Sequence, residues 1–253
     1  MKKLTTRDLR KLKGKALQML TCYDFQTAQL LNQSELDLIL VGDSLGNVVL
    51  GFDTTVPVTP AMMALFGAAV RRGAPDKFLV VDMPFGSYGT IGEALKTGRY
   101  LMQKTGAEAL KLEGAYPSEL EAITRMTQMG IAVMGHIGLT PQSVHQMGGY
   151  YTHGKNPARA QELLDEARRL EDAGCFSLVL ECVTPEISER ITQALSIPTI
   201  GIGSGEKVDG QVLVINDLFG MGAHPAPGFV KPVANLFQQR AELLKKYLQE
   251  RRG

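Results

Sequence analysis

The sequence predicts an α/β fold in the form of a single (β/α)8 barrel, and three observations support this prediction. Eight short apolar runs occur along the 253 residues, each followed by a turn signal. Most runs are then followed by a helix-compatible stretch, and this alternation is typical of βα units and a parallel sheet. A chain of this length buries roughly 70 to 75% of its unfolded surface, which supports one large core. Eight βα units in about 250 residues match the (β/α)8 architecture.

The predicted strands are nearly continuous apolar runs, such as LILVG and FSLVLE. Continuous hydrophobicity is expected for strands that are covered on both faces, as in an all-parallel sheet. In chain order the predicted strands span residues 16–21, 38–42, 78–81, 109–112, 131–135, 176–180, 198–202 and 211–215.

The helices between these strands are predicted from their start and stop signals. Proline is favoured in the first helical turn and glycine just after the last, and Thr59-Pro60 and Gly73 follow this pattern. The predicted helices span residues 59–73, 90–106, 117–130, 157–174, 185–195 and 235–251. No break in composition suggests a second domain, so we expect residues 1–253 to form one barrel domain with an N-terminal extension and a C-terminal helix.

The composition excludes several classes of protein. Hydrophobic residues make up 44% and charged residues 21%, which argues against intrinsic disorder. Lys and Arg (27) nearly cancel Asp and Glu (26), and no basic stripe occurs, so we expect no nucleic-acid partner. No signal peptide or long apolar segment is evident, and the three cysteines are Cys22, Cys175 and Cys182. An odd number without metal-site spacing suits a reducing compartment, so we expect a cytoplasmic protein without a membrane partner.

Polar residues stand directly after the predicted strands. In a (β/α)8 barrel the chemistry occurs at the carboxyl ends of the strands, where such residues would gather. Charged groups beside buried apolar strands are disfavoured unless they are paired or bound to a metal, so their repetition indicates a function. The residues in these positions are Asp24, Asp43 with Ser44, Asp82, Glu113, His136, Glu181, Ser204 and Asp217.

Two interpretations of these residues compete. A single Asp or Ser after a strand is often the N-cap of the next helix, and we assign Asp24 and Asp217 to that role. Asp43, Asp82 and Glu113 are different, because three carboxylates at one barrel mouth would repel one another without a cation. Mg²⁺ is the natural counter-ion, since it prefers oxygen ligands and is usually held by one or two carboxylates together with substrate and water.

Several strings at these strand ends occur together and in a fixed order. They are LVGDSLG (40–46), AAVRRGAP (68–75), DMPF (82–85), KLEG (111–114), GHIGLTPQSVHQMGGY (135–150), LVLECV (178–183), and IPTIGIGSG followed by DGQVLV. In these motifs the chain resembles the 3-methyl-2-oxobutanoate hydroxymethyltransferase family, also called ketopantoate hydroxymethyltransferase. The resemblance covers residues 20–222, about four-fifths of the chain.

The resemblance implies a Mg²⁺-dependent (β/α)8 enzyme of pantothenate biosynthesis that acts on small molecules. Its co-substrate would be 5,10-methylenetetrahydrofolate, whose one-carbon unit is moved onto 3-methyl-2-oxobutanoate to give 2-dehydropantoate. The resemblance also implies a large homo-oligomer, typically a decamer.

The same resemblance implies roles for individual residues. Asp43 and Asp82 would be the Mg²⁺ ligands and contact the substrate, and Glu113 would reach the metal directly or through water. Ser44 and Lys111 would bind the substrate. These parts suit a 2-oxo acid, which can chelate Mg²⁺ through its carboxylate and ketone oxygens.

Glu181 would be the catalytic base that removes the C3 proton. Two interpretations of His136 stay open. It could hydrogen-bond the enolate oxygen, a metal-bound water or Glu181, or it could be a structural histidine. Residues 138–156 are long, glycine-rich and without periodicity, so we expect a lid over the substrate or the pterin.

Four alternatives remain open at this point. Lys111 could form a Schiff base with a ketone and need no metal, and Cys182 could be a nucleophile, although a small core residue is the simpler interpretation. The chain could also be a Mg²⁺-dependent 2-oxo acid aldolase or lyase on a related barrel, or a catalytically silent binding or assembly protein. The chain departs from the family pattern at Leu65 and Phe66 and at Ala115 and Tyr116. These differences could alter helix packing or subunit contacts.

Overall fold

The computed structural model describes residues 3–252, and the chain divides into two compact units at the boundary between Val212 and Leu213. The first unit carries the barrel strands up to that boundary and the helices through α9. Each unit is described by itself below. The prediction of one domain over residues 1–253 stays a prediction.

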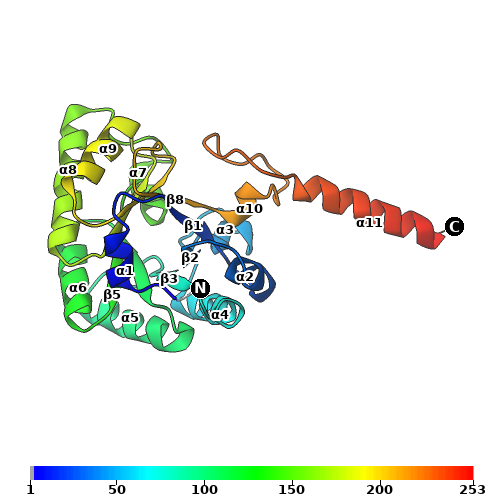
Figure 1. The fold of residues 1–253 in the computed structure, drawn as a ribbon, viewed down its shortest axis with the longest axis horizontal. Helices are drawn as coiled ribbons and strands as arrows, with labels where there is room; N and C mark the ends of the chain where they lie inside the picture. The colour runs from blue at the N-terminus through cyan, green and yellow to red at the C-terminus, as the bar shows by residue number, and fades with distance from the viewer. Residues whose placement is uncertain (1–2, 253) are drawn as a thin grey trace. The chain divides into compact units, whose positions relative to one another are not determined.

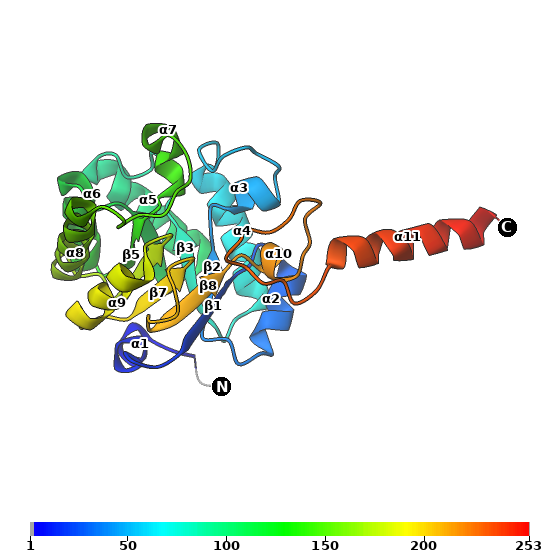
Figure 2. The same ribbon diagram turned by 90° about the horizontal axis from the view of Figure 1, so that it is seen from above.

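Eight parallel strands form a closed barrel in chain order, which confirms the predicted fold class (Figures 1 and 2). The strands are β1 Leu17–Thr21, β2 Leu38–Val41, β3 Phe78–Asp82, β4 Ala109–Glu113, β5 Ala132–Gly138, β6 Ser177–Glu181, β7 Thr199–Ile202 and β8 Gly210–Leu213. All eight predicted strands are present. The largest difference is in β5, which continues to Gly138 because its last residues still pair with β6.

The helices of the first unit lie outside these strands (Figure 1). They are α1 Thr6–Lys11, α2 Phe25–Asn32, α3 Leu45–Val48, α4 Pro60–Gly73, α5 Ile91–Thr105, α6 Pro117–Gln128, the 3-10 turn Pro141–Ser143, α7 Val144–Met147, α8 Pro157–Asp172 and α9 Pro185–Ala194. Predicted starts and stops are confirmed where caps form: the Thr59 hydroxyl accepts from Met62 N, and Gly106 ends α5 in the left-handed region.

The two residues assigned as N-caps differ in outcome. Asp24 is the N-cap of α2, and its Oδ1 accepts from Thr27 N at 2.8 Å, as predicted. The assignment of Asp217 is wrong, because α10 (Ile215–Leu218) begins earlier, with Val214 at its N-cap. Asp217 is the third residue of that helix, where a negatively charged side chain interacts favourably with the positive end of the helix dipole.

The second unit contains α10 and α11 (Leu236–Arg252), the latter predicted as residues 235–251. No residue of α11 is buried, and its Phe237, Leu244 and Tyr247 are exposed. Among the described residues no helix has the length and apolar character needed to cross a membrane.

Alternate residues of the strands fill the barrel interior, as strand geometry requires. The buried core cluster consists of Leu9, Leu17, Met19, Leu38, Leu40, Phe78, Val80, Ala109, Met134, Phe176, Val179, Ile200 and Val212. The Phe78 and Phe176 rings lie 5.7 Å apart and are tilted by 57°, a favourable aromatic arrangement. Leu9 of α1 joins the cluster, so this N-terminal helix packs against the barrel interior.

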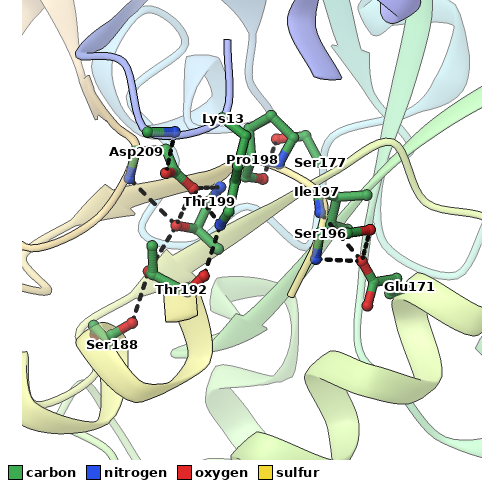
Figure 3. Close-up of polar contacts among 11 residues, drawn as sticks. Lys13, Glu171, Ser177, Ser188, Thr192, Ser196, Ile197, Pro198, Thr199 and Asp209 are labelled. Atoms are coloured by element: carbon green, nitrogen blue, oxygen red, sulfur yellow. Dashed lines mark hydrogen bonds and ion pairs between the residues drawn. The ribbon is translucent and has the colours of Figure 1, made fainter. Parts of the chain in front are cut away.

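The amino ends of β7 and β8 are joined to the N-terminal segment by Asp209 (Figure 3). Asp209 Oδ1 accepts from Gly14 N at 2.8 Å, and Oδ2 accepts from Thr199 N at 2.8 Å and from Lys13 Nζ at 2.7 Å. Lys13 Nζ also donates to Thr192 O, and the hydroxyls of Thr192 and Thr199 bond each other. We call these five residues the Asp209 network. Both carboxylate oxygens have donors, so this buried charge is fully paired.

Candidate active site at the carboxyl end of the barrel

The alternation that fills the core also places the polar residues in the barrel mouth. In β3, Phe78 and Val80 belong to the core cluster, and the next residue of the same parity is Asp82. Ala109 in β4 is followed in the same way by Lys111 and Glu113, and Met134 in β5 is followed by His136. Val179 in β6 is likewise followed by Glu181. These side chains therefore form the layer above the apolar core.

Neighbouring strands bring four of these side chains into contact. The strand register pairs Asp82 with Lys111 and Glu113 with His136. Lys111 Nζ lies 3.2 Å from Asp82 Oδ1, 3.8 Å from Glu113 Oε1 and 3.2 Å from His136 Nδ1. None of the four residues is more than 5% exposed. Burial alone would lower the pKa of Lys111, but Asp82, Glu113 and Asp43 outweigh it and raise the pKa above its usual value.

His136 lies between two carboxylates. Its Nδ1 is 3.3 Å from Glu113 Oε1, and its Nε2 is 3.2 Å from Glu181 Oε2, a contact at ion-pair distance without hydrogen-bond alignment. Burial and Lys111 both lower the pKa of His136, but the two carboxylates outweigh them and raise it to about 9. The same contacts act on Glu113: burial raises its pKa, and His136 and Lys111 bring it below the usual value. The two carboxylates therefore favour the charged form of His136.

Asp43 and Ser44 enter the mouth from the end of β2. Asp43 N donates to Asp82 Oδ2 at 3.0 Å, and Asp43 Oδ2 accepts from Gln142 Nε2 at 2.8 Å. Burial raises the pKa of Asp43 well above its usual range, and the charges of Glu113 and Asp82 raise it further. Ser44 is the residue before α3, and its Oγ lies 2.7 Å from the buried Tyr23 hydroxyl. The predicted substrate-binding residues thus lie beside the predicted metal ligands.

Glu181 is held by its backbone at the end of β6. Its carbonyl accepts from Leu139 N at 2.8 Å, and Cys182 after it adopts the left-handed conformation at φ 49°. Gly138 allows this approach, because a Cβ at that position would lie 2.3 Å from the Glu181 carbonyl oxygen. The Glu181 side chain is 18% exposed, more than the other side chains of the cluster. It therefore combines a fixed backbone with access from the mouth.

Sequence reasoning missed Gln142, which joins the cluster from the connection after β5. Gln142 Nε2 donates to both Asp43 Oδ2 and Met83 O, its backbone N donates to Glu113 Oε2, and its Oε1 accepts from Tyr88 at 2.6 Å. Tyr88 was missed as well, as was Tyr23, although Tyr23 directly precedes Asp24 in the first strand-end segment. The segment 138–156, for which a lid is predicted, therefore contacts the site residues through Gln142.

The donor set fits a divalent cation held by few protein ligands. Burial raises the pKa of Asp82 despite the opposing charge of Lys111, so two neighbouring carboxylates lack full neutralisation. Asp82 Oδ1 is buried and makes no aligned hydrogen bond. Within residues 3–252, no three His, Cys, Asp or Glu side chains are arranged to hold a metal by themselves. Mg²⁺ does not require such a group, because one or two carboxylates with water and substrate suffice.

The structure weighs against Lys111 and Cys182 as nucleophiles. A Schiff base needs a neutral amine, and the raised pKa keeps Lys111 protonated. Burial raises the pKa of Cys182 to about 11, with Glu181 adding to the shift, so its thiol is not ionised at neutral pH. Ser204 has a structural role, since its Oγ donates to Leu180 O and accepts from Val183 N.

A cavity of about 1000 Å³ opens beside Glu113. Its walls come from the connections after β3, β4 and β5 and from α8, and they include much of residues 138–156. Ala115 and Tyr116, where the chain departs from the family pattern, line this cavity. Leu65 is 68% exposed on α4, and Phe66 beside it is partly buried. Two of the four departures thus affect a cavity next to the site.

Solved structures of other barrels resemble this fold. A phosphoenolpyruvate phosphomutase from Streptomyces platensis subsp. rosaceus matches with a TM-score of 0.70 and 12% identity, over 98% of this chain and 88% of that chain. A putative phosphonomutase from Burkholderia cenocepacia J2315 matches with a TM-score of 0.66 and 16% identity, over 97% of each chain. At these identities the likeness concerns the fold alone.

Sequence comparison gives a much closer result. Proteins named 3-methyl-2-oxobutanoate hydroxymethyltransferase are 47% identical in Lysinibacillus sphaericus, over 97% of this chain and 88% of that protein, and 47% identical in Syntrophus aciditrophicus, over 98% and 92%. The family model described as ketopantoate hydroxymethyltransferase matches residues 3–253. Since this match spans both units and all seven candidate residues, the chain belongs to the ketopantoate hydroxymethyltransferase family.

Proposed function

We propose that the chain transfers a hydroxymethyl unit from 5,10-methylenetetrahydrofolate to 3-methyl-2-oxobutanoate, giving 2-dehydropantoate in pantothenate biosynthesis. Membership of the family, with 47% identity over 97% of the chain, carries the proposal. The chemistry of the barrel mouth supports it, because the predicted base and substrate-binding groups converge on one layer above the core. In the balanced reaction C3 loses its proton and bonds the donor carbon, and water supplies the new hydroxyl oxygen. Both bonds from the donor carbon to folate nitrogens break, and tetrahydrofolate leaves with one proton from C3 and one from water.

Asp43 and Asp82 are the proposed ligands of Mg²⁺, with Glu113 reaching the ion directly or through water. When bound, Mg²⁺ supplies a Lewis acid for the carboxylate and 2-oxo groups of the substrate. Gln142 orients Asp43, and the Asp43 backbone N–H orients Asp82. The contacts of Glu113 with His136 and Gln142 N occupy both of its oxygens, which favours the water-mediated arrangement for this residue.

Lys111 and Ser44 are proposed to position the substrate. A protonated Lys111 pairs with a carboxylate, and the Ser44 hydroxyl, held by Tyr23, can donate to a second substrate oxygen. Glu181 takes the C3 proton, and His136, whose Nε2 lies 3.2 Å from Glu181 Oε2, orients the Glu181 carboxylate. His136 acts through Glu181 and is a positioning residue in this scheme.

Proton exchange at C3 of 3-methyl-2-oxobutanoate tests this function in two stages. The first stage follows deuterium incorporation by NMR without folate, and we expect exchange that EDTA abolishes and Mg²⁺ restores. The second stage adds 5,10-methylenetetrahydrofolate and follows 2-dehydropantoate. Exchange that persists in EDTA, or covalent trapping of substrate on Lys111 by borohydride, would contradict the metal-dependent scheme. Product formation with a free aldehyde but not with the folate would identify a 2-oxo acid aldolase instead, and no exchange at all would identify a silent barrel.

We also propose that the chain works in the cytoplasm as a homo-oligomer, specifically a decamer, as the family resemblance implies. Sedimentation at micromolar concentration tests the oligomer, and a species of ten times the 27.5 kDa chain mass is expected.

A further inference from the structure

The cavity beside Glu113 is separate from most of the proposed reacting groups. Its lining among the described residues includes Glu113 but not Asp43, Lys111 or Glu181. Its volume of about 1000 Å³ is at the upper end of the range for small-molecule sites, roughly 300 to 1,000 Å³. A second molecule can therefore lie in this cavity and meet the 2-oxo acid at the Glu113 side of the mouth.

One wall of the cavity carries a carboxylate without a partner. Glu119 is the third residue of α6, and its Oε2 is buried and has no hydrogen-bond partner within the described part of the chain. At the same position of α5, Glu93 bonds back to the backbone of the N-cap in a capping box, as does Asp8 in α1. Glu119 makes no such bond. A buried carboxylate oxygen without a donor is costly, so this position indicates that a donor arrives with a ligand.

The connection before α6 makes room for the Glu119 side chain. Gly114 has φ 101°, and a Cβ there would lie 3.4 Å from Glu119 Cγ and 3.8 Å from Glu119 Oε2. The carboxylate therefore lies against the turn that directly follows Glu113. Glu119 Oε2 therefore lies next to Gly114, the residue that follows Glu113 in the chain.

A second unpartnered group lines the same cavity. His153 is only 4% exposed, and its Nε2 has no hydrogen-bond partner among residues 3–252. Its backbone is fixed by bonds to Cys182 and Thr184, and its ring stacks on Tyr151 with centroids 4.4 Å apart. Burial and Arg159 lower the pKa of His153, so its ring is neutral and can donate or accept one hydrogen bond.

Exposed aromatic rings complete the lining. Phe85, Tyr116 and Tyr151 line the cavity, and each is at least half exposed. Such rings offer flat faces on which a planar heterocycle can stack. Together with a carboxylate and a neutral imidazole, this lining suits a flat, polar ring system that carries adjacent N–H donors.

We propose that this cavity binds the pterin ring of the one-carbon donor, with Glu119 accepting hydrogen bonds from the pterin N3–H and 2-amino group. These two N–H groups form a guanidine-like edge that matches the two oxygens of one carboxylate. His153 Nε2 bonds a further nitrogen or oxygen of the ring, and Tyr116 provides a stacking face. The inference rests on the proposed function, because that function requires a folate to approach Glu113.

Binding of tetrahydrofolate and of 6-methyltetrahydropterin, measured by anaerobic calorimetry with 3-methyl-2-oxobutanoate and Mg²⁺ present, tests the assignment. Glu119→Ala should weaken both ligands by about 10- to 100-fold, the usual worth of hydrogen bonds to a charged group. Glu119→Gln should weaken them as well, because an amide sets a donor against one of the pterin donors. The matched control is Glu121→Gln, which removes the same charge from an exposed position of α6 and should change affinity less than two-fold.

Folate-free C3 exchange separates the two hypotheses. If wild-type exchange is present and Glu119→Ala binds tetrahydrofolate as tightly as wild type, the pterin site is wrong and the proposed function stands. If wild-type exchange is absent, the proposed function fails. If Glu119→Ala weakens tetrahydrofolate but not 6-methyltetrahydropterin, Glu119 contacts the tail and the assignment to the pterin ring is overturned. If the pterin site is correct, Glu119→Ala lowers the rate of hydroxymethyl transfer by a larger factor than the rate of C3 exchange. Where the alanine variant fails to fold, the glutamine variant decides.

Discussion

The two ends of the barrel contain buried aspartates in opposite situations. At the amino end, Asp209 has backbone, hydroxyl and ammonium donors for both oxygens. At the carboxyl end, Asp43 and Asp82 lie close to each other and to Glu113, and burial raises the pKa of both. The residue type and the degree of burial are the same, so the neighbours make the difference. At the amino end the aspartate stabilises the fold, and at the carboxyl end we propose that the aspartates bind a cation and a substrate.

The largest expected effect comes from Glu181, because a positioned base accounts for roughly 10² to 10⁴ in rate. Glu181→Gln should slow turnover and C3 exchange by that factor while the chain stays folded. Rates by NMR and urea denaturation check the two halves of this prediction. The control is Glu186→Gln, an exposed position at the start of α9. Near wild-type turnover in Glu181→Gln would remove Glu181 from the mechanism.

The amino end should respond in the opposite way. Asp209→Asn removes the charge that pairs with Lys13 and replaces one acceptor by a donor facing Thr199 N or Gly14 N. We expect the free energy of unfolding to fall by about 2 to 4 kcal/mol, measured by urea denaturation. The exposed Asp172→Asn is the control, with an expected change within about 0.5 kcal/mol. A loss of turnover without a loss of stability in Asp209→Asn would contradict the division between the two ends.

The pH dependence of the metal-free protein should report the carboxyl end. The pKa of His136 is raised from its usual 6.5 to about 9. The stabilisation from its charged form is complete below pH 6.5 and is lost as the pH rises through about 9. The free energy of unfolding in EDTA should therefore fall by about 1 to 3 kcal/mol between pH 6.5 and 9.5. His136→Asn should flatten this slope, and an unchanged slope would assign the effect to other groups.

The smallest expected effect is a gain of stability. Burial and the charges of Glu113 and Asp82 raise the pKa of Asp43, so its ionised form costs stability at neutral pH. Asp43→Asn should raise the unfolding free energy of the metal-free protein by about 1 kcal/mol while C3 exchange falls. Calorimetric unfolding in EDTA, with and without added Mg²⁺, measures this change. A destabilised variant would mean that the bond from Gln142 to Asp43 outweighs the like-charge repulsion.

Sequence reasoning predicted the strands, where apolar residues form short continuous runs. The strands were predictable because they are apolar on both faces, and the places of Asp82, Glu113 and Glu181 at strand ends were predictable with them. The roles of these residues stay predictions. The helix α2 was not predicted, since FQTAQLLN has neither a proline at its start nor a glycine at its end. Asp24 was nevertheless recognised as a cap.

Gln142 shows the limit of this reasoning. It lies in an irregular segment, and its bond to Asp43 joins residues 99 positions apart in the sequence. No local periodicity predicts such a contact, since it depends on how the connection after β5 returns over the barrel mouth. Glu119 is a related case, because no local pattern predicts that its carboxylate lies against Gly114.

The Asp209 network also has a consequence for synthesis of the chain. Asp209 contacts Lys13 and Gly14, which lie 196 and 195 positions earlier in the sequence. The barrel therefore cannot close until Asp209 has left the ribosome. Until then, β1 and the last completed strand are open sheet edges, which are prone to pairing with other chains. Long-range closure of this kind is slow, because loop entropy is lost before the contact is gained. Nascent chains that stall before residue 209 should therefore be the aggregation-prone species of this protein and the ones that chaperones bind.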